Sequence, residues 1–356
     1  MKKEKSDSHP IYNLKSLWAD HSHNIWLATL LNVSRNLAKF KFPHKMDKGR
    51  KEQTMSLIFD GMKNCPELSS PKLFKAEQID IMEKEFLLEH FLAREDFYQA
   101  HGNEGFIIDA SGNFLGVVNL KNHLQLRLVD TTQELEKSWN HLVRIEGDLS
   151  NRLDFAFNSR FGFLTEDPRC SGTALQVSLY LHIPATIHTG ELTELLDREK
   201  DQEVQAIGLQ GKANEMVGDI LVASNNCTLG LTEEYILTAM RMWATRAVVT
   251  EINLRKKLIE EQDEHMKSKV ARALGLLTHS YHLELIEALN ALSLVKLGVE
   301  IGWIKSPPKL NLNDILFGCR RAHLIHSLQE PIEMPDLPKK RATYLQQIGN
   351  QLTLTI

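Results

Sequence analysis

The stretch FGFLTEDPRCSGTALQVSLYLHIP, residues 161–184, predicts a strand that is entered through a polar turn. From Leu175 onward apolar and polar residues alternate, so successive side chains point to opposite faces of an extended chain. One face would carry Leu175, Val177, Leu179, Leu181 and Ile183, and the other Gln176, Ser178, Tyr180 and His182. The preceding Asp167-Pro168 and Ser171-Gly172-Thr173 are typical turn residues. We therefore expect the turn to deliver polar side chains to the non-core face of a central strand.

This stretch resembles the phosphagen (ATP:guanido) kinase superfamily, and within it the bacterial protein-arginine kinases, whose pattern reads FGFLT-x-C-P-x-N-x-G-T-G-L-R. The framework of glycine, threonine and apolar positions agrees with that pattern. The positions that carry chemistry differ. Here Asp167 stands at the reactive cysteine, Cys170 at the asparagine, Ala174 at the second glycine and Gln176 at the phosphate-binding arginine.

Residues 24–43, NIWLATLLNVSRNLAKFKFP, predict a strand that runs into a helix. They resemble the family's nucleotide-binding stretch, S-S-R-x-R-x-A-R-N-L before a phenylalanine-proline pair, with which Arg35-Asn36-Leu37 and Phe42-Pro43 agree. The nucleotide-site positions are Thr29, Leu30 and Asn32, and the last two replace the upstream arginines. The alternative is that Trp26 to Leu31 form only a buried apolar strand.

A hairpin and a further strand are predicted for residues 106–128, because two apolar runs flank the turn sequence DASGN and Leu124, Leu126 and Leu128 alternate with polar residues. After the second strand the family writes N-E-E-D-H-x-R, in which acidic residues hold the guanidinium and act as base. This chain writes NLKNHLQ over residues 119–125. Leu120 and Lys121 therefore stand at the carboxylates, and Gln125 stands at the arginine.

Two further segments carry nucleotide-site equivalents by resemblance. Residues 207–218 resemble R-G-x-Y-G-E-G-S-E-A-x-G, with Ile207 at the arginine, Gly208 retained and Lys212 at the acidic position. In the helix predicted around EKEFLLEHFLARED, His90 aligns with a histidine that the family places against the nucleotide. A purely structural histidine is the alternative interpretation of His90.

None of the residues at the five family arginine positions can carry positive charge: Leu30, Asn32, Gln125, Gln176 and Ile207. Phosphoryl transfer depends mostly on positioning and on neutralising the charge of the transferring group. Guanidinium groups suit this task because they are always charged and bind phosphate bidentately. The favoured hypothesis is a pseudokinase, a homologue of protein-arginine kinase that has lost phosphoryl transfer and acts as a binding or regulatory subunit.

Two alternatives stay open. An active protein-arginine kinase with a remodelled site would hold the phosphate with Lys121, Lys212, Arg127 and Arg169, and would use Glu166, Asp167 or His123 as base. A structural oligomerisation protein would need only its helical C-terminal region, so that truncation there would abolish function. Mg-ATP is the cofactor that the resemblance implies. Binding of Mg-ATP would distinguish the active kinase with a remodelled site from the pseudokinase.

Composition and charge restrict the class of protein. The formal net charge is −4, from 42 basic and 46 acidic residues, which gives no electrostatic reason to expect nucleic-acid or membrane binding. The cysteines form no metal-binding spacing, and we expect reduced thiols at Cys65, Cys170, Cys227 and Cys319. No bound metal is therefore expected. No apolar segment follows the charged start, so we expect a cytoplasmic protein.

The predicted fold class is α+β, with a largely antiparallel sheet flanked by helices and followed by an all-helical region. The boundaries are residues 1–20 for an N-terminal tail and short helix, 21–250 for the phosphagen-kinase-like domain and 251–356 for the helical domain. Residues 46–53 are expected to form a basic linker and residues 189–203 a mobile loop. Leu285, Leu289, Leu292, Val295 and Val299 repeat at helical spacing in the last region.

The resemblance also implies partners. Protein-arginine kinases dimerise through the helical domain and work with a small zinc-binding activator protein, so we expect a homodimer, an activator of this type and protein clients. Their R-D-x-x-R-A element, which senses phosphoarginine, aligns with residues 337–342, LPKKRA, where only Arg341-Ala342 agree. Pro338 within this element argues against an uninterrupted helix there.

Overall fold

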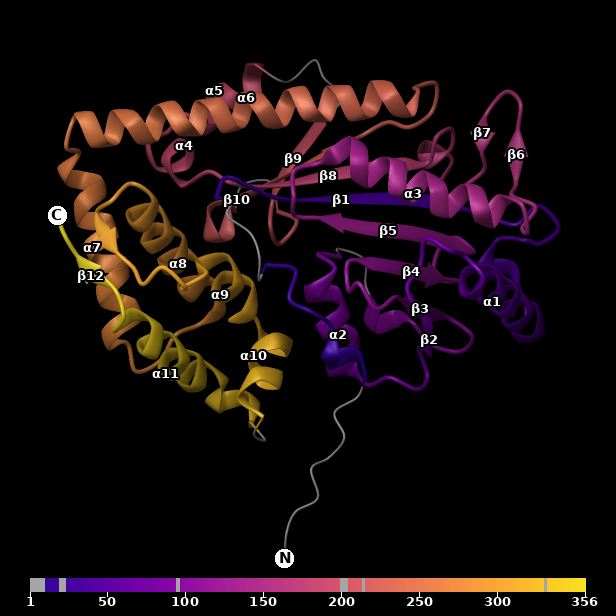
Figure 1. Cartoon of the computed structure of the whole chain (residues 1–356), viewed down its shortest axis with the longest axis horizontal. Helices are drawn as coiled ribbons and strands as arrows, with labels where there is room; N and C mark the ends of the chain where they lie inside the picture. The colour runs from indigo at the N-terminus through magenta and orange to yellow at the C-terminus, as the bar shows by residue number, and fades with distance from the viewer. Residues whose placement is uncertain (1–9, 19–23, 94–96, 199–203, 213–214, 330–331) are drawn as a thin grey trace, which may run out of the picture.

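An eight-stranded sheet forms the centre of the computed structural model, which describes residues 10–18, 24–93, 97–198, 204–212, 215–329 and 332–356. The strand order is β2-β3-β4-β5-β1-β8-β10-β9, and every pairing is antiparallel. The predicted α+β fold with an antiparallel sheet is confirmed (Figure 1). The strands are β1 (Trp26–Arg35), β2 (Lys72–Lys75), β3 (Gly105–Ile108), β4 (Phe114–Val118), β5 (Leu124–Asp130), β8 (Leu175–His182), β9 (Val204–Gly208) and β10 (Ile220–Asn225).

Helices cover both faces of the sheet (Figure 1). On one face, α1 (Lys48–Lys63), α3 (Leu135–Ser150) and α6 (Glu233–Glu260) pack on the apolar side chains of the strands. On the other face, α2 (Ile81–His90) and the C-terminal helices share a second apolar core with the sheet. These helices are α7 (Glu264–His279), α8 (Leu285–Glu300), α9 (Leu312–Gly318), α10 (Arg321–Leu328) and α11 (Leu337–Gly349).

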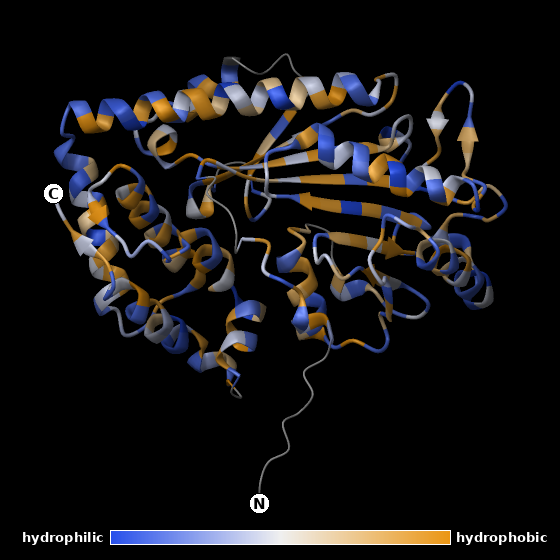
Figure 2. Cartoon of the chain, viewed as in Figure 1, coloured by the Kyte–Doolittle hydropathy of each residue, from blue (hydrophilic) through white to orange (hydrophobic). Residues whose placement is uncertain are grey.

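The remaining elements are short. Two helices, α4 (Pro184–His188) and α5 (Leu192–Arg198), lie between β8 and β9 in the chain. A two-stranded hairpin pairs β6 (Phe157–Asn158) with β7 (Gly162–Phe163), and a separate two-stranded sheet pairs β11 (Ile304–Lys305) with β12 (Thr353–Leu354). The strands of the large sheet are mainly orange in Figure 2, as expected for a sheet that helices cover on both sides.

The alternation predicted for β8 is confirmed, and its polar face has two environments. The apolar face, from Leu175 to Ile183, belongs to the core under α3 and α6. On the opposite face Gln176 is exposed, whereas His182 is buried and its Nε2 lies 2.8 Å from Ser293 Oγ of α8. The C-terminal helices therefore cover one end of this face and leave the other end open as a cleft.

Three local expectations were wrong. The segment after β1 forms no α-helix, only a 3₁₀ turn at Pro43–Lys45. Most of the expected linker at residues 46–53 belongs to α1, because Asp47 accepts a hydrogen bond from Arg50 N and caps that helix. The expected mobile loop at residues 189–203 contains α5, and its residues 199–203 lie outside the described part of the chain.

Further details concern the two ends of the chain and its helices. Pro338 lies in the first turn of α11, where a missing N–H costs nothing, so it starts this helix and does not interrupt it. The expected short helix at residues 11–18 is only a 3₁₀ turn at Pro10–Asn13. Helix α6 runs without a break across residue 250, the predicted domain boundary. No helix within the described residues is long and apolar enough to span a bilayer.

Candidate functional site

Three neighbouring strands place four polar side chains on one face of the sheet. Asn32 of β1 lies opposite Gln176 of β8, and Ser34 of β1 lies opposite Gln125 of β5. Residues 32 and 34 share a face because side chains alternate along a strand. These four side chains, which we call the amide floor, line a cavity of about 190 Å³.

The walls of this cavity come from three loops. Lys121 and Asn122 follow β4, the turn of residues 165–174 precedes β8, and residues 225–228 include the end of β10 and the loop after it. Thr228 joins two of these loops, because its Oγ1 donates to Ser171 O at 2.7 Å and its carbonyl accepts from Thr173 N at 3.3 Å. The turn of residues 165–174 therefore places polar side chains in this cavity, as the sequence predicted.

Hydrogen bonding in the amide floor is incomplete. Asn32 is 7% exposed, and no described residue offers a hydrogen bond to its Oδ1. Gln125 Oε1 accepts from Arg127 Nη2 at 3.1 Å, which leaves the amide nitrogen of Gln125 for the cavity. Arg127 itself is buried and lies 5.4 Å from the centre of the Phe97 ring, outside the cavity lining. The floor is thus an uncharged hydrogen-bonding surface.

Charged groups at the cavity mouth largely neutralise one another. Arg169 bonds Asp167 at 2.7 Å, and this hydrogen bond holds the pKa of the Asp167 carboxyl below its usual value. Glu166 lies 3.0 Å from His44 Nδ1. Burial raises the pKa of the Cys170 thiol, so a thiolate is disfavoured there. Within the described residues no carboxylate forms an ion pair with the exposed Lys121.

The structure brings together five of the predicted site residues and separates the others. The cavity is lined by Asn32, Lys121, Gln125, Asp167 and Gln176. Thr29 points to the opposite face of the sheet, where its Oγ1 accepts from Trp26 Nε1 at 3.0 Å. Leu30 and Ile207 are buried in the apolar core, and Leu120 packs against it.

Gly208 ends β9, and Lys212 lies in the turn that follows. A Cβ at Gly208 would lie 1.9 Å from Glu215 O, so the close approach of the two backbones requires glycine. Lys212 is exposed and pairs with Glu215 at 2.6 Å. Neither residue lines the cavity of the amide floor. The glycine is thus explained by packing of this turn alone.

His90 lies outside this cavity, between α2 and the C-terminal helices. Its Nε2 donates to Gly112 O at 2.7 Å, and its ring stacks 6.0 Å from that of His323. Burial lowers the pKa of His90 to about 3, with a further contribution from the charge of His323. The geometry is that of a neutral, hydrogen-bonded core histidine, which was the alternative interpretation.

Two more residues of the resemblance have structural contacts. His123 Nδ1 accepts from Leu37 N and His123 Nε2 donates to Lys41 O, both at 2.9 Å, so neither ring nitrogen is open to a substrate. Arg341 is buried, and its guanidinium donates to the carbonyls of Cys319 and Leu283. These contacts hold loops and helices together.

Sequence reasoning left out part of the cavity lining. Ser34 was overlooked although it stands two residues after Asn32, where the period of a strand puts it on the same face. Asn122, Thr165 and Asn226 also line the cavity, and only the folding of three distant loops brings them there. No local pattern in the sequence indicates these three.

Two family models match the chain. The profile "ATP:guanido phosphotransferase, C-terminal catalytic domain" matches residues 53–254, and "Protein-arginine kinase McsB C-terminal domain" matches residues 263–353. The chain belongs to the protein-arginine kinase family of ATP:guanido phosphotransferases. The family transfers phosphate from ATP, and the resemblance seen in the sequence is confirmed.

Individual relatives support the same assignment. The chain is 36% identical to a protein-arginine kinase of Chlamydia pneumoniae over 91% of this chain and 90% of that protein. It is 28% identical to a protein-arginine kinase of Syntrophomonas wolfei over 91% of both. The fold is also that of lombricine kinase, with a TM-score of 0.56, 15% identity and coverage of 68% of this chain and 70% of the other.

Proposed function

We propose that this member of the protein-arginine kinase family does not transfer phosphate and acts as a pseudokinase, a binding or regulatory subunit. The observation that carries the proposal is the amide floor. Where the family pattern has arginines, Asn32, Gln125 and Gln176 give an uncharged surface. An amide offers hydrogen bonds but no charge, so it cannot neutralise a transferring phosphoryl group as a guanidinium does.

The residues present do not fit Mg-ATP. Only two cationic side chains line the described cavity, Lys121 and Arg169, and the second is bonded to Asp167. A polyphosphate carries several negative charges, and the other charged groups at the mouth are the carboxylates of Glu166 and Asp167. The cofactor of the family is therefore not part of the function that we propose for this chain.

The remodelled active kinase is supported less well. Of its four proposed phosphate ligands, Arg127 lies buried beside Gln125, outside the cavity lining, and Lys212 lies on another turn, so they do not converge with Lys121 and Arg169. Among its proposed bases, His123 has both ring nitrogens in hydrogen bonds. Asp167 and Glu166 are engaged with Arg169 and His44.

Partners and compartment belong to the same proposal. A regulatory subunit of this family would work as a homodimer with a small zinc-binding activator protein or with protein clients. A cytoplasmic site of action fits the four cysteines, which are all free thiols.

The test is an assay for phosphoarginine. The protein is incubated with Mg-ATP and an arginine-rich protein, with and without a candidate activator, and acid-labile phosphoarginine is measured by mass spectrometry. We expect no signal above a heat-treated control, and none from Gln176→Arg. Loss of one preorganised donor costs about 10²–10³ in rate, and several are absent together. Phosphoarginine that disappears in Lys121→Ala would refute the pseudokinase and favour the remodelled site.

A further inference from the structure

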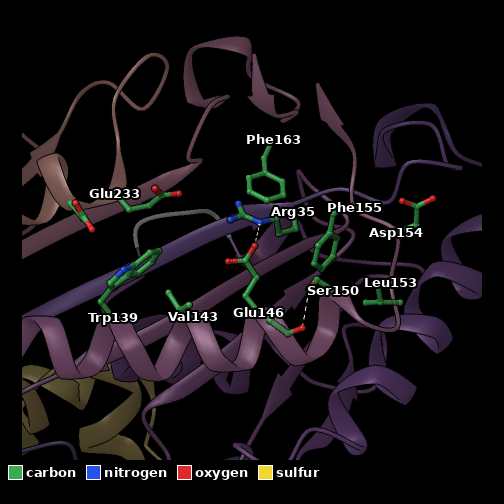
Figure 3. A pocket seen from close by; sticks show the side chains of 12 residues that line it. Arg35, Trp139, Val143, Glu146, Ser150, Leu153, Asp154, Phe155, Phe163 and Glu233 are labelled. Atoms are coloured by element: carbon green, nitrogen blue, oxygen red, sulfur yellow. Dashed lines mark hydrogen bonds and ion pairs between the residues drawn. The ribbon is translucent and has the colours of Figure 1, made fainter. Parts of the chain in front are cut away.

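A trough of about 590 Å³ lies on the other face of the sheet from the amide floor. It runs along α3, beneath the β6–β7 hairpin and past the first turn of α6 (Figure 3). Trp139 and Glu233 lie toward one end of it, and Asp154 lies at the other. No part of the proposed function uses this trough.

Its charge is negative. Arg35 is buried and donates to Glu146 at 2.5 Å, so these two groups neutralise each other in the middle of the trough. Among the ion pairs of the described residues none involves Glu233 or Glu234. Asp154 has only Lys39, at 3.9 Å and with both side chains well exposed. Glu233 therefore has only a longer-range interaction with Arg35, which Glu146 already neutralises, and Glu234 has no ion pair among the described residues.

The walls are aromatic. Trp139, Phe155 and Phe163 line the trough, and Phe163 already covers a guanidinium, that of Arg35, at 3.5 Å from its ring centre. Two more aromatic residues are close in sequence to the lining. Tyr235 follows Glu234 and is 58% exposed, and Phe161 lies two residues before Phe163 and is 45% exposed. Aromatic faces beside carboxylates suit a long cationic side chain, whose stem is apolar and whose head is charged.

We propose that the trough is a docking site for an arginine-bearing segment of a protein partner. The guanidinium would lie against Trp139 and pair with Glu233 and Glu234, while the aliphatic stem would pack on Val143. Arginine is favoured over lysine because its planar head stacks on aromatic rings and forms paired hydrogen bonds with carboxylates. The site is complementary in charge to its partner and does not depend on whether the cleft on the other face transfers phosphate.

The test uses the full chain and a fluorescein-labelled peptide of alternating arginine and serine, followed by fluorescence anisotropy. Glu233→Gln with Glu234→Gln should weaken binding by about tenfold, because the peptide would lose two exposed ion pairs. The matched control is Glu260→Gln with Glu261→Gln, which removes the same charge from the exposed far end of α6. It should bind as tightly as the unchanged protein, and circular dichroism checks that both variants are folded.

Four results would overturn the proposal. The first is no binding of the peptide by the unchanged protein at millimolar concentration. The second is equal weakening by both pairs of substitutions, which would indicate unspecific attraction by charge. The third is weakening by Glu166→Gln with Asp167→Asn in place of the trough variant, which would put the peptide in the cleft. A lysine peptide that binds as tightly as the arginine peptide would also contradict the stacked guanidinium.

Discussion

Asn32 shows at the scale of a single residue how the cleft of this chain differs from the family pattern. Its side chain is almost fully buried, and its Oδ1 has no hydrogen-bond donor among the described residues. Burial of an unpaired polar atom costs about 1–3 kcal/mol. Asn32 lies opposite Gln176 on the neighbouring strand. Two uncharged amides at this place suit an uncharged hydrogen-bonding partner better than a phosphate.

His90 makes stability depend on pH. Its pKa falls from 6.5 to about 3 on burial, so between these values the unfolded chain binds a proton that the folded chain does not. Stability that is present above pH 6.5 is therefore lost as the pH falls, by about 2 kcal/mol at pH 5 from this residue alone. We expect His90→Gln, which keeps a donor for Gly112 O and cannot titrate, to remove that part of the loss.

Urea unfolding at pH 7.5 and at pH 5 measures this effect. His265→Gln, an exposed histidine on α7, serves as the control and should keep the pH dependence of the unchanged protein. Equal pH dependence of the unchanged protein and of His90→Gln would show that His90 does not titrate as its burial indicates.

At the scale of elements, the turn before β8 depends on one glycine. Gly172 has φ +100°, and a Cβ there would lie 2.4 Å from Thr228 O and 2.9 Å from Leu229 Cα. Both atoms belong to the backbone, which cannot rotate away as a side chain can. We expect Gly172→Ala to destabilise the protein by about 2 kcal/mol or more, through the strained conformation and the clash.

Thermal and urea unfolding provide the measurement. Gly275→Ala in the interior of α7 is the matched control, since nothing lies within 4 Å of its added methyl group. It should stabilise the protein by up to about 1 kcal/mol, because alanine is the better helix former. A Gly172→Ala protein as stable as the unchanged one would show that the loop after β10 moves aside easily.

Elements with a clear period could be predicted from the sequence, and the others could not. The alternation from Leu175 to Leu181 predicted β8 correctly because one face of that strand is wholly apolar. The start of α1 was missed because its first turns are charged, and its buried residues begin only at Thr54. Nor does any local pattern place residues 32, 125 and 176 on neighbouring strands. Only the family resemblance assigned these three positions to one site.

The whole molecule exposes apolar side chains in its C-terminal region, which is the basis for expecting a homodimer. Leu276, Tyr281 and Ile286 are 39%, 74% and 39% exposed. Apolar side chains gathered on a surface commonly mark an interface. Multi-angle light scattering at tens of micromolar should give twice the mass of one chain, and Tyr281→Asp should lower it. Val249→Asp, an exposed site on α6 before the helical region, is the control. A monomer at this concentration would contradict the expectation.

The sheet and the C-terminal helices are joined by buried polar contacts as well as by a shared apolar core. Ser293 of α8 bonds both His182 of β8, at 2.8 Å, and Asp219, at 2.5 Å. Lys296 of α8 donates to Asn24 O at 2.6 Å and pairs with Glu300. Burial lowers the pKa of Lys296, whereas the neighbouring Glu300 favours its charged form. Separation of the two parts would therefore break the hydrogen bonds that His182, Asp219 and Asn24 O form with α8.

We accordingly expect the two parts to unfold together, in one calorimetric transition whose van't Hoff and calorimetric enthalpies agree. Lys296→Met leaves Glu300 buried with only Arg255 as its partner, and breaking a buried pair typically costs about 3–5 kcal/mol. The whole transition should move to lower temperature, whereas Lys257→Met on the exposed side of α6 should leave it in place. Two transitions, of which Lys296→Met shifts only one, would show that the sheet and the helical region are independent domains. In that case the helical region could act alone as an oligomerisation module.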